Sequence, residues 1–394
     1  MVELPPGMRP VWAEIDLDNL AANVRKVVSH SAPAVVMAVV KANAYGHGAL
    51  QVAKVCLENG ARWLGVGLVE EAQELRRAGI AAPIHIMSMP TPEQAEAVVK
   101  GGFSCGISDL EVAEALAAAG RRYGRSAKVQ VKVDTGMGRL GLLPDEVLVF
   151  VEKLKQFSNL EIIGLYTHFS SSDERDKSYT IAQYKVFKNV LTNLAEHGHT
   201  FSWVHAANSA ALLDTPEFGE NLVRPGIILY GLYPSEEVSR QITLKPVMSL
   251  KARISFVKKL PAGSAVSYGR TYVTKKETTI AGVPIGYADG WSRLLSDKGQ
   301  VLVGGRRLPI IGRICMDQFM IEVTEDLYVS LGDEVVLFGG QGTETIPVEE
   351  VAHLLNTINY EVICMVGPRI PRVYVKGGRV IGVEKMVQTS YHED

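Results

Sequence analysis

The most constraining feature of the sequence is a recurring order of short apolar run, turn and amphipathic helix, which begins near residue 34. The apolar runs are typical of strands buried on both faces. They lie at 34–40, 63–67, 84–87, 103–107, 129–134, 162–168, 201–206 and 222–230. The clearest helical patterns between them lie at 70–77, 92–100, 110–119, 146–155 and 181–197. Eight such units before residue 245 favour a closed (β/α)8 barrel of the TIM type over an open doubly wound sheet.

The pattern changes after residue 245, where short alternating strands are separated by glycine-rich turns. This texture is typical of a mostly antiparallel β domain. One helix is expected at 348–355, whereas the stretch near Tyr360 is ambiguous. We therefore predict two domains, an N-terminal barrel at 1–245, which includes a leading strand at 11–15, and a C-terminal β domain at 246–394.

Length and composition limit the classes of protein to consider. The 394 residues are too many for one ordinary core, and 47% hydrophobic with 21% charged residues is typical of globular proteins. A net charge of −2 gives no general attraction to nucleic acid or to anionic membranes. The N-terminal residues do not resemble a signal peptide, and the four cysteines have no metal-binding spacing. We expect a cytoplasmic protein without disulfides, metal, membrane anchor or nucleic-acid partner.

In a barrel of this kind, the active site forms at the C-terminal ends of the strands. The polar residues expected at that end are Lys41, Lys132, Asp134, Arg139, His168, His205, Asn208, Ser209, Arg224 and Gly226. Each has a structural alternative, because a lone histidine is often a core residue and Asn208-Ser209 could simply cap a helix. Their coincidence on one rim favours a shared site.

Lys41 is unusual because it closes an apolar strand, where a lysine either extends to water or uses its amine in a site. Barrels commonly bind phosphate in the loops after strands seven and eight, which here contain Ser209 and the pair Gly226-Ile227. Flavin or nicotinamide would use those loops but leave Lys41 without a function. The combination favours pyridoxal 5′-phosphate held covalently by Lys41.

Residues 39–48, VVKANAYGHG, resemble the cofactor-lysine signature of the alanine racemase family. Further matches lie in the family's order at 132–141 (KVDTGMGRLG), 167–169 (THF), 205–209 (HAANS), 223–227 (VRPGI), 266–269 (VSYG), 286–290 (GYADG), 312–318 (GRICMDQ) and 358–361 (INYE). Together they cover nearly the whole chain, with no departure at a position expected to function.

This resemblance implies a two-base interconversion of L-alanine and D-alanine, which supplies D-alanine for peptidoglycan. Lys41 would act on one face of Cα and Tyr268 on the other, with the tyrosine linked through His168 to Arg224. A phenol with a reference pKa of about 10 needs such positive or hydrogen-bonding surroundings to act as a base. Arg224 would face the ring nitrogen of the cofactor, and because arginine cannot take up a proton, the ring would be a weak electron sink.

The resemblance also assigns the remaining site residues. It implies that the cofactor is bound by Tyr45, His168, Asn208, Ser209, Arg224, Gly226, Ile227 and Tyr360. Arg139 and the backbone of Met316 would bind the carboxylate of alanine, Tyr287 would line a narrow entrance, and Lys132 would carry a carbamate. Tyr268 and Met316 would come from the other subunit, so the active unit would be a head-to-tail homodimer with composite sites.

Three alternatives remain open at this point. An amino-acid decarboxylase could share the lysine and the fold class, but its ring-nitrogen partner is typically acidic, unlike Arg224. A non-catalytic pyridoxal-phosphate carrier would be a single barrel, without the residues after 245. A racemase of the same family could act on serine or on several amino acids.

Overall fold

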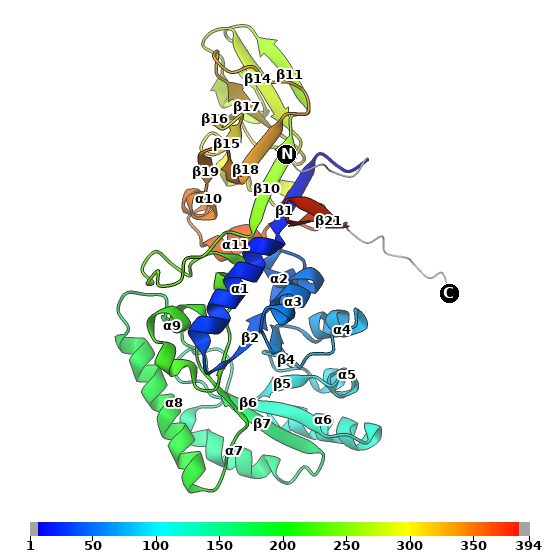
Figure 1. Ribbon diagram of the computed structural model, residues 1–394, viewed down its shortest axis with the longest axis vertical. Helices are drawn as coiled ribbons and strands as arrows, with labels where there is room; N and C mark the ends of the chain where they lie inside the picture. Colours follow the sequence, from blue (N-terminus) through cyan, green and yellow to red (C-terminus); the bar gives the residue numbers. More distant parts are fainter. Residues whose placement is uncertain (1–6, 386–394) are drawn as a thin grey trace, which may run out of the picture. The chain divides into compact units, whose positions relative to one another are not determined.

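A computed structural model of the protein describes residues 7–385 (Figure 1). The described chain divides into a barrel unit, residues 20–44 and 49–245, and a β unit, residues 7–19, 45–48 and 246–385. The chain therefore passes from the barrel unit into the β unit directly after Ala44 and returns at Ala49.

The barrel unit contains eight parallel strands in the order β8-β7-β6-β5-β4-β3-β2-β9. Their bounds are β2 (Val35–Val39), β3 (Trp63–Val66), β4 (Ile84–Ile86), β5 (Ser104–Ile107), β6 (Ala127–Lys132), β7 (Leu160–Tyr166), β8 (Trp203–His205) and β9 (Leu222–Val223). Backbone hydrogen bonds join β9 to β8, from Asn221 N–H to Val204 O at 3.3 Å and from Arg224 N–H to Ala207 O at 3.0 Å. The predicted (β/α)8 barrel is confirmed.

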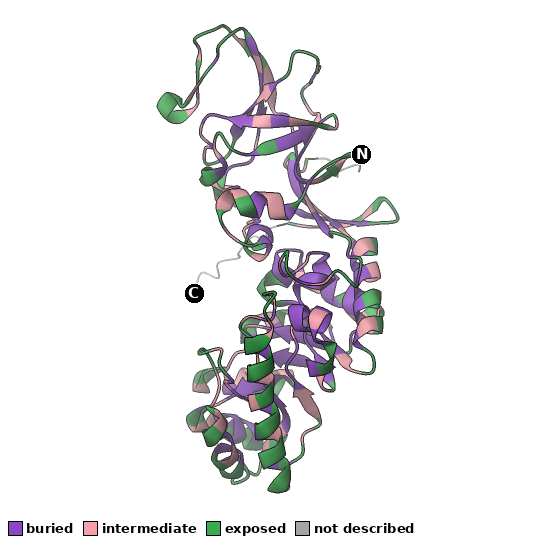
Figure 2. Ribbon diagram, turned by 90° about the vertical axis from the view of Figure 1, so that its left-hand side faces the viewer, coloured by how far each residue is buried: buried purple, intermediate pink, exposed green. Residues whose placement is uncertain are grey.

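Helices surround these strands on the outside (Figure 1). They are α1 (Leu17–Ser31), α3 (Ala49–Glu58), α4 (Val69–Arg77), α5 (Ala95–Gly101), α6 (Leu110–Tyr123), α7 (Val147–Leu154), α8 (Ser178–Glu196) and α9 (Ser209–Asp214). Helix α6 illustrates why they form: Asp109 caps its first turn through the Glu111 and Val112 N–H groups, and Leu116 lies on its buried face. Figure 2 shows that the strands of the barrel unit are buried, whereas its helices are exposed on their outer side.

The β unit is built on an 11-stranded sheet with one two-stranded ribbon beside it. The sheet contains β1 (Val11–Asp16), β10 (Met248–Arg253), β11 (Phe256–Leu260), β14 (Thr278–Val283), β15 (Gln300–Val303), β16 (Arg306–Ile311), β17 (Phe319–Val323), β18 (Glu334–Gln341), β19 (Glu344–Ile346), β20 (Arg372–Lys376) and β21 (Arg379–Glu384). The ribbon is β12 (Ala265–Val266) with β13 (Tyr272–Val273), and the main helices are α10 (Val348–Leu355) and α11 (Asn359–Cys364). All pairings except β1 with β20 are antiparallel, as predicted for this domain.

Strand β1 departs from the expected barrel range of 1–245, because it lies in the sheet of the β unit. It pairs antiparallel with β10 and parallel with β20, in the registers Val11↔Ala252 and Ala13↔Arg372. Both of its edges are thus occupied by strands more than 200 residues away in sequence, which a local pattern cannot reveal. The barrel unit begins within α1, at Leu20.

The eighth predicted strand, 222–230, is also shorter than expected. Only Leu222 and Val223 form β9, and a 3-10 helix, η4 (Ile227–Tyr230), follows. Pro225 has no N–H to donate to a neighbouring strand, so the ladder stops before it. The apolar run therefore contains a loop at the rim of the barrel.

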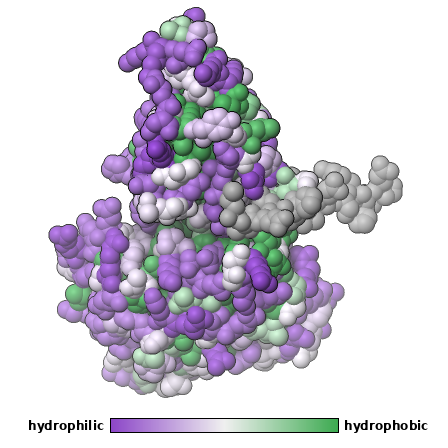
Figure 3. All heavy atoms as spheres, turned by 45° about the horizontal axis from the view of Figure 1, so that its top comes forward, coloured by the Kyte–Doolittle hydropathy of each residue, from purple (hydrophilic) through white to green (hydrophobic). Residues whose placement is uncertain are grey.

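The surface visible in Figure 3 is predominantly hydrophilic, with apolar side chains in small groups. Among residues 7–385, no helix combines the length and the apolar character needed to cross a membrane.

Candidate active site

Lys41 lies directly after β2 and begins a short turn of unusual hand, α2 (Lys41–Tyr45). Ala42, Asn43 and Ala44 have φ values of 53°, 52° and 53°, in the left-handed region. Each non-glycine residue in a left-handed turn costs roughly 1–2 kcal/mol. The Ala44 N–H donates to Val40 O at 2.9 Å and closes the turn. The sequence pattern did not predict this left-handed turn, because the polarity of side chains does not indicate the sign of φ.

The stem of Lys41 extends beside Gly67, which follows β3. A Cβ at Gly67 would lie 3.7 Å from Cβ and 3.8 Å from Cδ of Lys41. Glycine at this position therefore leaves room for the lysine side chain at the rim.

Arg224, on the loop after β9, is buried and donates four hydrogen bonds. Its acceptors are His205 Nδ1 at 2.6 Å, Thr167 O at 2.7 Å, Ala206 O at 3.0 Å and His168 Nδ1 at 3.3 Å. Because arginine has donors only, both ring nitrogens must accept, and each neutral imidazole carries its proton on Nε2. Burial, and then the charge of Arg224, hold the pKa of both histidines well below its usual range.

The hydrogen bonds continue from His205 into the middle of the barrel. His205 Nε2 donates to Gln130 Oε1 at 2.6 Å, and Gln130 Nε2 donates to His85 Nδ1 at 3.2 Å, which Ser104 Oγ also contacts at 3.0 Å. Burial, reinforced by Arg224 and Lys132, lowers the pKa of His85 to about 3. Sequence reasoning missed Gln130 and His85, since both lie inside predicted strands.

Positive charge is concentrated around Lys132, the last residue of β6. The pKa of its amine is lowered to about 8, mainly by burial. The charges of Arg224, Arg139 and Lys41 add to this lowering, and Asp134 opposes it. The barrel unit thus brings together two lysines and two arginines that the sequence had placed at the ends of three different strands. Such a cluster is suited to an anionic ligand.

Arg139 lies on the exposed loop that follows β6. One oxygen of the Asp134 carboxylate, Oδ1, accepts the N–H groups of Gly136, Met137 and Gly138 at 2.9, 2.8 and 3.1 Å. Asp134, which the sequence placed on the rim, therefore fixes the shape of the loop that carries Arg139.

The loops after β8 and β9 are joined through Ser209, which is buried and accepts the Gly226 N–H at 2.8 Å through Oγ. Ile227 opens η4, and the first N–H groups of a helix have no partner within it. Asn208 caps α9 through the Ala211 N–H at 3.0 Å and accepts from Ser172 Oγ at 2.9 Å. The structural alternative for Asn208, a helix cap, is thus realised, while Ser209 and Gly226 form one hydrogen-bonded edge of the barrel rim.

The tyrosines expected at the cofactor lie in the β unit. The rings of Tyr45, which is buried, and Tyr360, on α11, are 6.1 Å apart at an angle of 46°. Burial, followed by the nearby Cys364, raises the pKa of Tyr45 above its ordinary value, which leaves its hydroxyl protonated and able to donate.

Three further expected residues of the β unit are exposed, with 71% for Tyr268, 53% for Met316 and 43% for Tyr287. Backbone hydrogen bonds connect two of their segments, from Tyr287 N–H to Cys315 O at 3.1 Å and from Ala288 N–H to Met316 O at 3.0 Å. Ser267, beside Tyr268, donates from Oγ to Arg313 O at 2.6 Å and lies 3.4 Å from Cys315 Sγ. Tyr268 and Cys315 also line a hollow of about 620 Å³ with Val266 and Met320.

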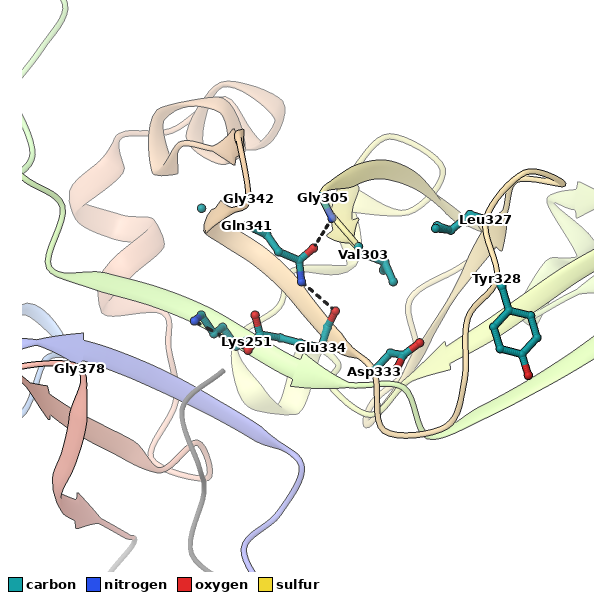
Figure 4. A pocket seen from close by; sticks show the side chains of 12 residues that line it. Lys251, Val303, Gly305, Leu327, Tyr328, Asp333, Glu334, Gln341, Gly342 and Gly378 are labelled. Atoms are coloured by element: carbon teal, nitrogen blue, oxygen red, sulfur yellow. Dashed lines mark hydrogen bonds and ion pairs between the residues drawn. The ribbon is translucent and has the colours of Figure 1, made fainter.

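A second hollow of the β unit, of about 710 Å³, is shown in Figure 4. Lys251 lines it but is already paired with Glu14 at 2.8 Å and, at longer range, with Glu334 at 3.9 Å. Gln341 spans it, accepting from Gly305 N–H and donating to Glu334 O. None of the expected site residues lines this hollow.

Comparison with known proteins places this geometry in a family. Residues 15–234 match the family described as "Alanine racemase, N-terminal domain", and residues 247–374 match "Alanine racemase, C-terminal domain". An alanine racemase of Desulforamulus reducens is 50% identical over 369 residues, which is 93% of this chain and 99% of that protein.

Solved structures agree with these sequence matches. Alanine racemase from Clostridium difficile 630 superposes with a TM-score of 0.92 at 38% identity, over 97% of this chain and all of that one. Alanine racemase from Bartonella henselae, solved with covalently bound pyridoxal phosphate, gives 0.84 at 32% identity, over 93% of this chain and 100% of that one. The chain is an enzyme that belongs to the alanine racemase family.

Proposed function

We propose that the protein interconverts L-alanine and D-alanine with pyridoxal 5′-phosphate held by Lys41. The observation that carries this proposal is the position of Lys41 at the end of β2, on the barrel whose rim also holds the Arg224–His168 pair and the Ser209–Gly226 edge. The Bartonella relative with covalently bound cofactor supports the same assignment.

The chemistry of the barrel's polar groups fits this cofactor. The cluster of Lys41, Lys132, Arg139 and Arg224 favours an anion. Burial first, and then repulsion from the other cations, lowers the pKa of Lys132. Ser209 Oγ accepts from Gly226, so its own hydrogen can donate to a phosphate, together with the Ile227 N–H. Tyr45 and Tyr360 would add hydroxyl donors, and Asn208 would act through its cap of α9.

When bound, the cofactor supplies an electron-withdrawing ring that makes the Cα proton of an amino acid more acidic. Arg224 would be the residue that donates to the ring nitrogen. Its surroundings support this role, because its hydrogen-bond acceptors are neutral histidines and carbonyl oxygens. No carboxylate among these partners offsets its positive charge. Arg224 donates hydrogen bonds but keeps its proton, so it would leave the ring nitrogen unprotonated, which suits return of the proton to Cα.

Two bases of this protein would exchange the proton at Cα. The amine of Lys41 would act on one face and Tyr268 of the partner subunit on the other. Since Arg224 occupies Nδ1 of His168, the proton of that imidazole is on Nε2, where it could donate to the tyrosine oxygen and favour its anionic form. Arg224 would thus influence Tyr268 through the hydrogen bonds of one neutral imidazole, that of His168.

The substrate carboxylate would be bound by Arg139 and by the backbone N–H of Met316 of the partner subunit. Lys132 would carry a carbamate, whose negative charge would steady Arg139. A pKa of about 8 supports this, because only the neutral amine reacts with carbon dioxide. Tyr287 would narrow the entrance to the site.

Tyr268 and Met316 support a head-to-tail homodimer, because both are exposed in the single chain and Tyr268 lines a hollow that could receive a partner's side chains. In this arrangement the β unit supplies the second base and the subunit contacts. D-alanine made in the cytoplasm would serve as a peptidoglycan precursor.

A substrate panel tests the proposal against the alternatives. The purified protein is incubated separately with D-alanine, D-serine and D-lysine, while optical rotation and released carbon dioxide are followed. Loss of rotation with alanine, without carbon dioxide, supports an alanine racemase. Carbon dioxide release would indicate a decarboxylase, and equal rates on all three substrates would indicate a broad racemase.

A further inference from the structure

Glu71, on the third residue of α4, contacts two different strand-end loops with its two carboxylate oxygens. Oε2 accepts the Gly67 N–H at 2.7 Å and the Leu68 N–H at 3.1 Å, at the start of its own helix. Oε1 accepts the Ala42 N–H at 2.6 Å, from the residue that follows Lys41. One side chain thus joins the end of β3 to the left-handed turn after β2.

The contact with Gly67 and Leu68 is a local capping box, and the barrel contains two comparable examples. At the start of η1 (Pro92–Gln94), Gln94 Oε1 accepts the Thr91 N–H at 3.1 Å. At the start of η2 (Pro144–Glu146), Glu146 Oε2 accepts the Leu143 N–H at 2.9 Å. Because glutamine performs this task at 94, the local box alone does not require a carboxylate at 71.

The second oxygen of Glu71 is therefore the distinctive feature, because it bonds to a turn whose backbone conformation is unfavourable. Four consecutive non-glycine residues after Lys41, residues 42–45, have positive φ, a conformation that L-residues avoid. Two side-chain contacts hold the turn: Glu71 accepts the Ala42 N–H, and Asn43, within the turn, accepts the Ala49 N–H through Oδ1 at 2.7 Å. Glu71 ties the turn to the neighbouring strand, beside Gly67 and the stem of Lys41.

We infer that Glu71 is a positioning residue for Lys41, which sets the left-handed turn and thereby the direction of the lysine side chain. The inference concerns the turn itself and stands on contacts within the barrel unit. Its consequence for cofactor binding rests on the proposed function.

The test compares Glu71→Gln with the matched control Glu146→Gln. A glutamine at 71 has one acceptor oxygen, so it can keep the local box or the Ala42 contact, but not both. Amide hydrogen exchange of the cofactor-free protein should be faster in peptides covering 41–48 by about tenfold or more in E71Q, as expected for loss of a charge-assisted hydrogen bond. E146Q should exchange there like the wild type.

The second measurement is spectroscopic titration with pyridoxal 5′-phosphate. E71Q should bind it about tenfold more weakly and lose kcat with little change in the KM for alanine, because the amine of Lys41 is misplaced while Arg139 is not. If the wild type fails to bind the cofactor, the proposed function fails, while the exchange experiment still decides the role of Glu71.

A second variant guards against a general folding defect. Ala42→Gly lowers the cost of a positive φ at residue 42, so E71Q/A42G should recover part of the lost protection and of the cofactor affinity. Exchange at 41–48 and cofactor affinity equal in E71Q and E146Q would overturn the inference, and so would an absence of recovery in the double variant.

Discussion

Arg224 Nη1 donates to His205 Nδ1 at 2.6 Å, so a buried guanidinium is held by an imidazole that must be neutral. Among residues 7–385, no carboxylate pairs with Arg224. The guanidinium thus keeps an uncompensated positive charge at the rim, where the proposed cofactor would bind.

Gln130→Leu should disturb Arg224 indirectly, through the hydrogen bond that Gln130 accepts from His205. The leucine leaves the Nε2 proton of His205 without its acceptor, and an unsatisfied buried polar group costs about 1–3 kcal/mol. We expect the free energy of unfolding to fall by that amount in urea denaturation, with a clear loss of kcat. Gln73→Leu, at a half-buried position on α4, should change both by much less. Wild-type kcat in Q130L would show that the hydrogen bonds beyond His205 do not matter.

The buried histidines should make the protein sensitive to acid. In His85, with a pKa of about 3, the folded value lies below the unfolded value of about 6.5, so the unfolded chain binds more protons between these limits. Stability from this group is complete above pH 6.5 and is lost as the pH falls, by about 1.4 kcal/mol per pH unit. His85→Gln should therefore flatten the dependence of unfolding free energy on pH between 6.5 and 4.5.

The control for this prediction is the exposed His197, replaced in the same way. His197→Gln should leave the slope of unfolding free energy against pH as in the wild type. A slope in His85→Gln that matches the wild type would mean that His85 is protonated in the folded protein.

Lys132 should react with carbon dioxide more readily than an ordinary lysine. With a pKa of about 8, about one amine in ten is neutral at pH 7, against about three in ten thousand for a pKa of 10.5. In ¹³C NMR of protein kept at constant dissolved ¹³CO2, a carbamate signal should grow from pH 7 to pH 9. Lys132→Arg should lack this signal, and its absence from the wild type at every pH would contradict the assignment.

The barrel could be predicted from the sequence because each strand is a short apolar run. Its rim could be predicted because Lys41, Lys132 and Arg224 mark the ends of three of these strands. The candidate site was predicted from the same pattern, since parallel strands bring their carboxyl ends to one edge. Other features depend on distant partners. Strand β1 is placed by β10 and β20, and Gln130 meets His205 only once the barrel closes.

The left-handed turn and Glu71 represent a different limit. Ala42 and Ala44 are good helix formers, so composition predicts nothing unusual after Lys41. Glu71 could have been recognised from its position near the start of α4 as a capping residue, but its reach to Ala42 needs coordinates.

Single-base variants should separate the two faces of the substrate. In deuterium oxide, Tyr268→Phe should exchange the Cα hydrogen of one alanine enantiomer only, because Lys41 remains as the sole base. Lys41→Arg, which keeps the positive charge, should lose exchange with both enantiomers if the lysine also holds the cofactor. Exchange of both enantiomers at the wild-type rate in Y268F would exclude Tyr268 as a base. Chiral chromatography with mass detection measures all four rates.

Subunit mixing tests most directly the claim that Lys41 of one subunit and Tyr268 of its partner form one site. Lys41→Ala and Tyr268→Ala proteins, each inactive, are mixed under conditions in which subunits exchange, and racemisation of L-alanine is measured. With random exchange, half of the dimers are mixed and each has one intact site of two, so about a quarter of wild-type activity should return. Activity that stays at the level of the separate variants, although mass spectrometry demonstrates mixed dimers, would contradict the composite site.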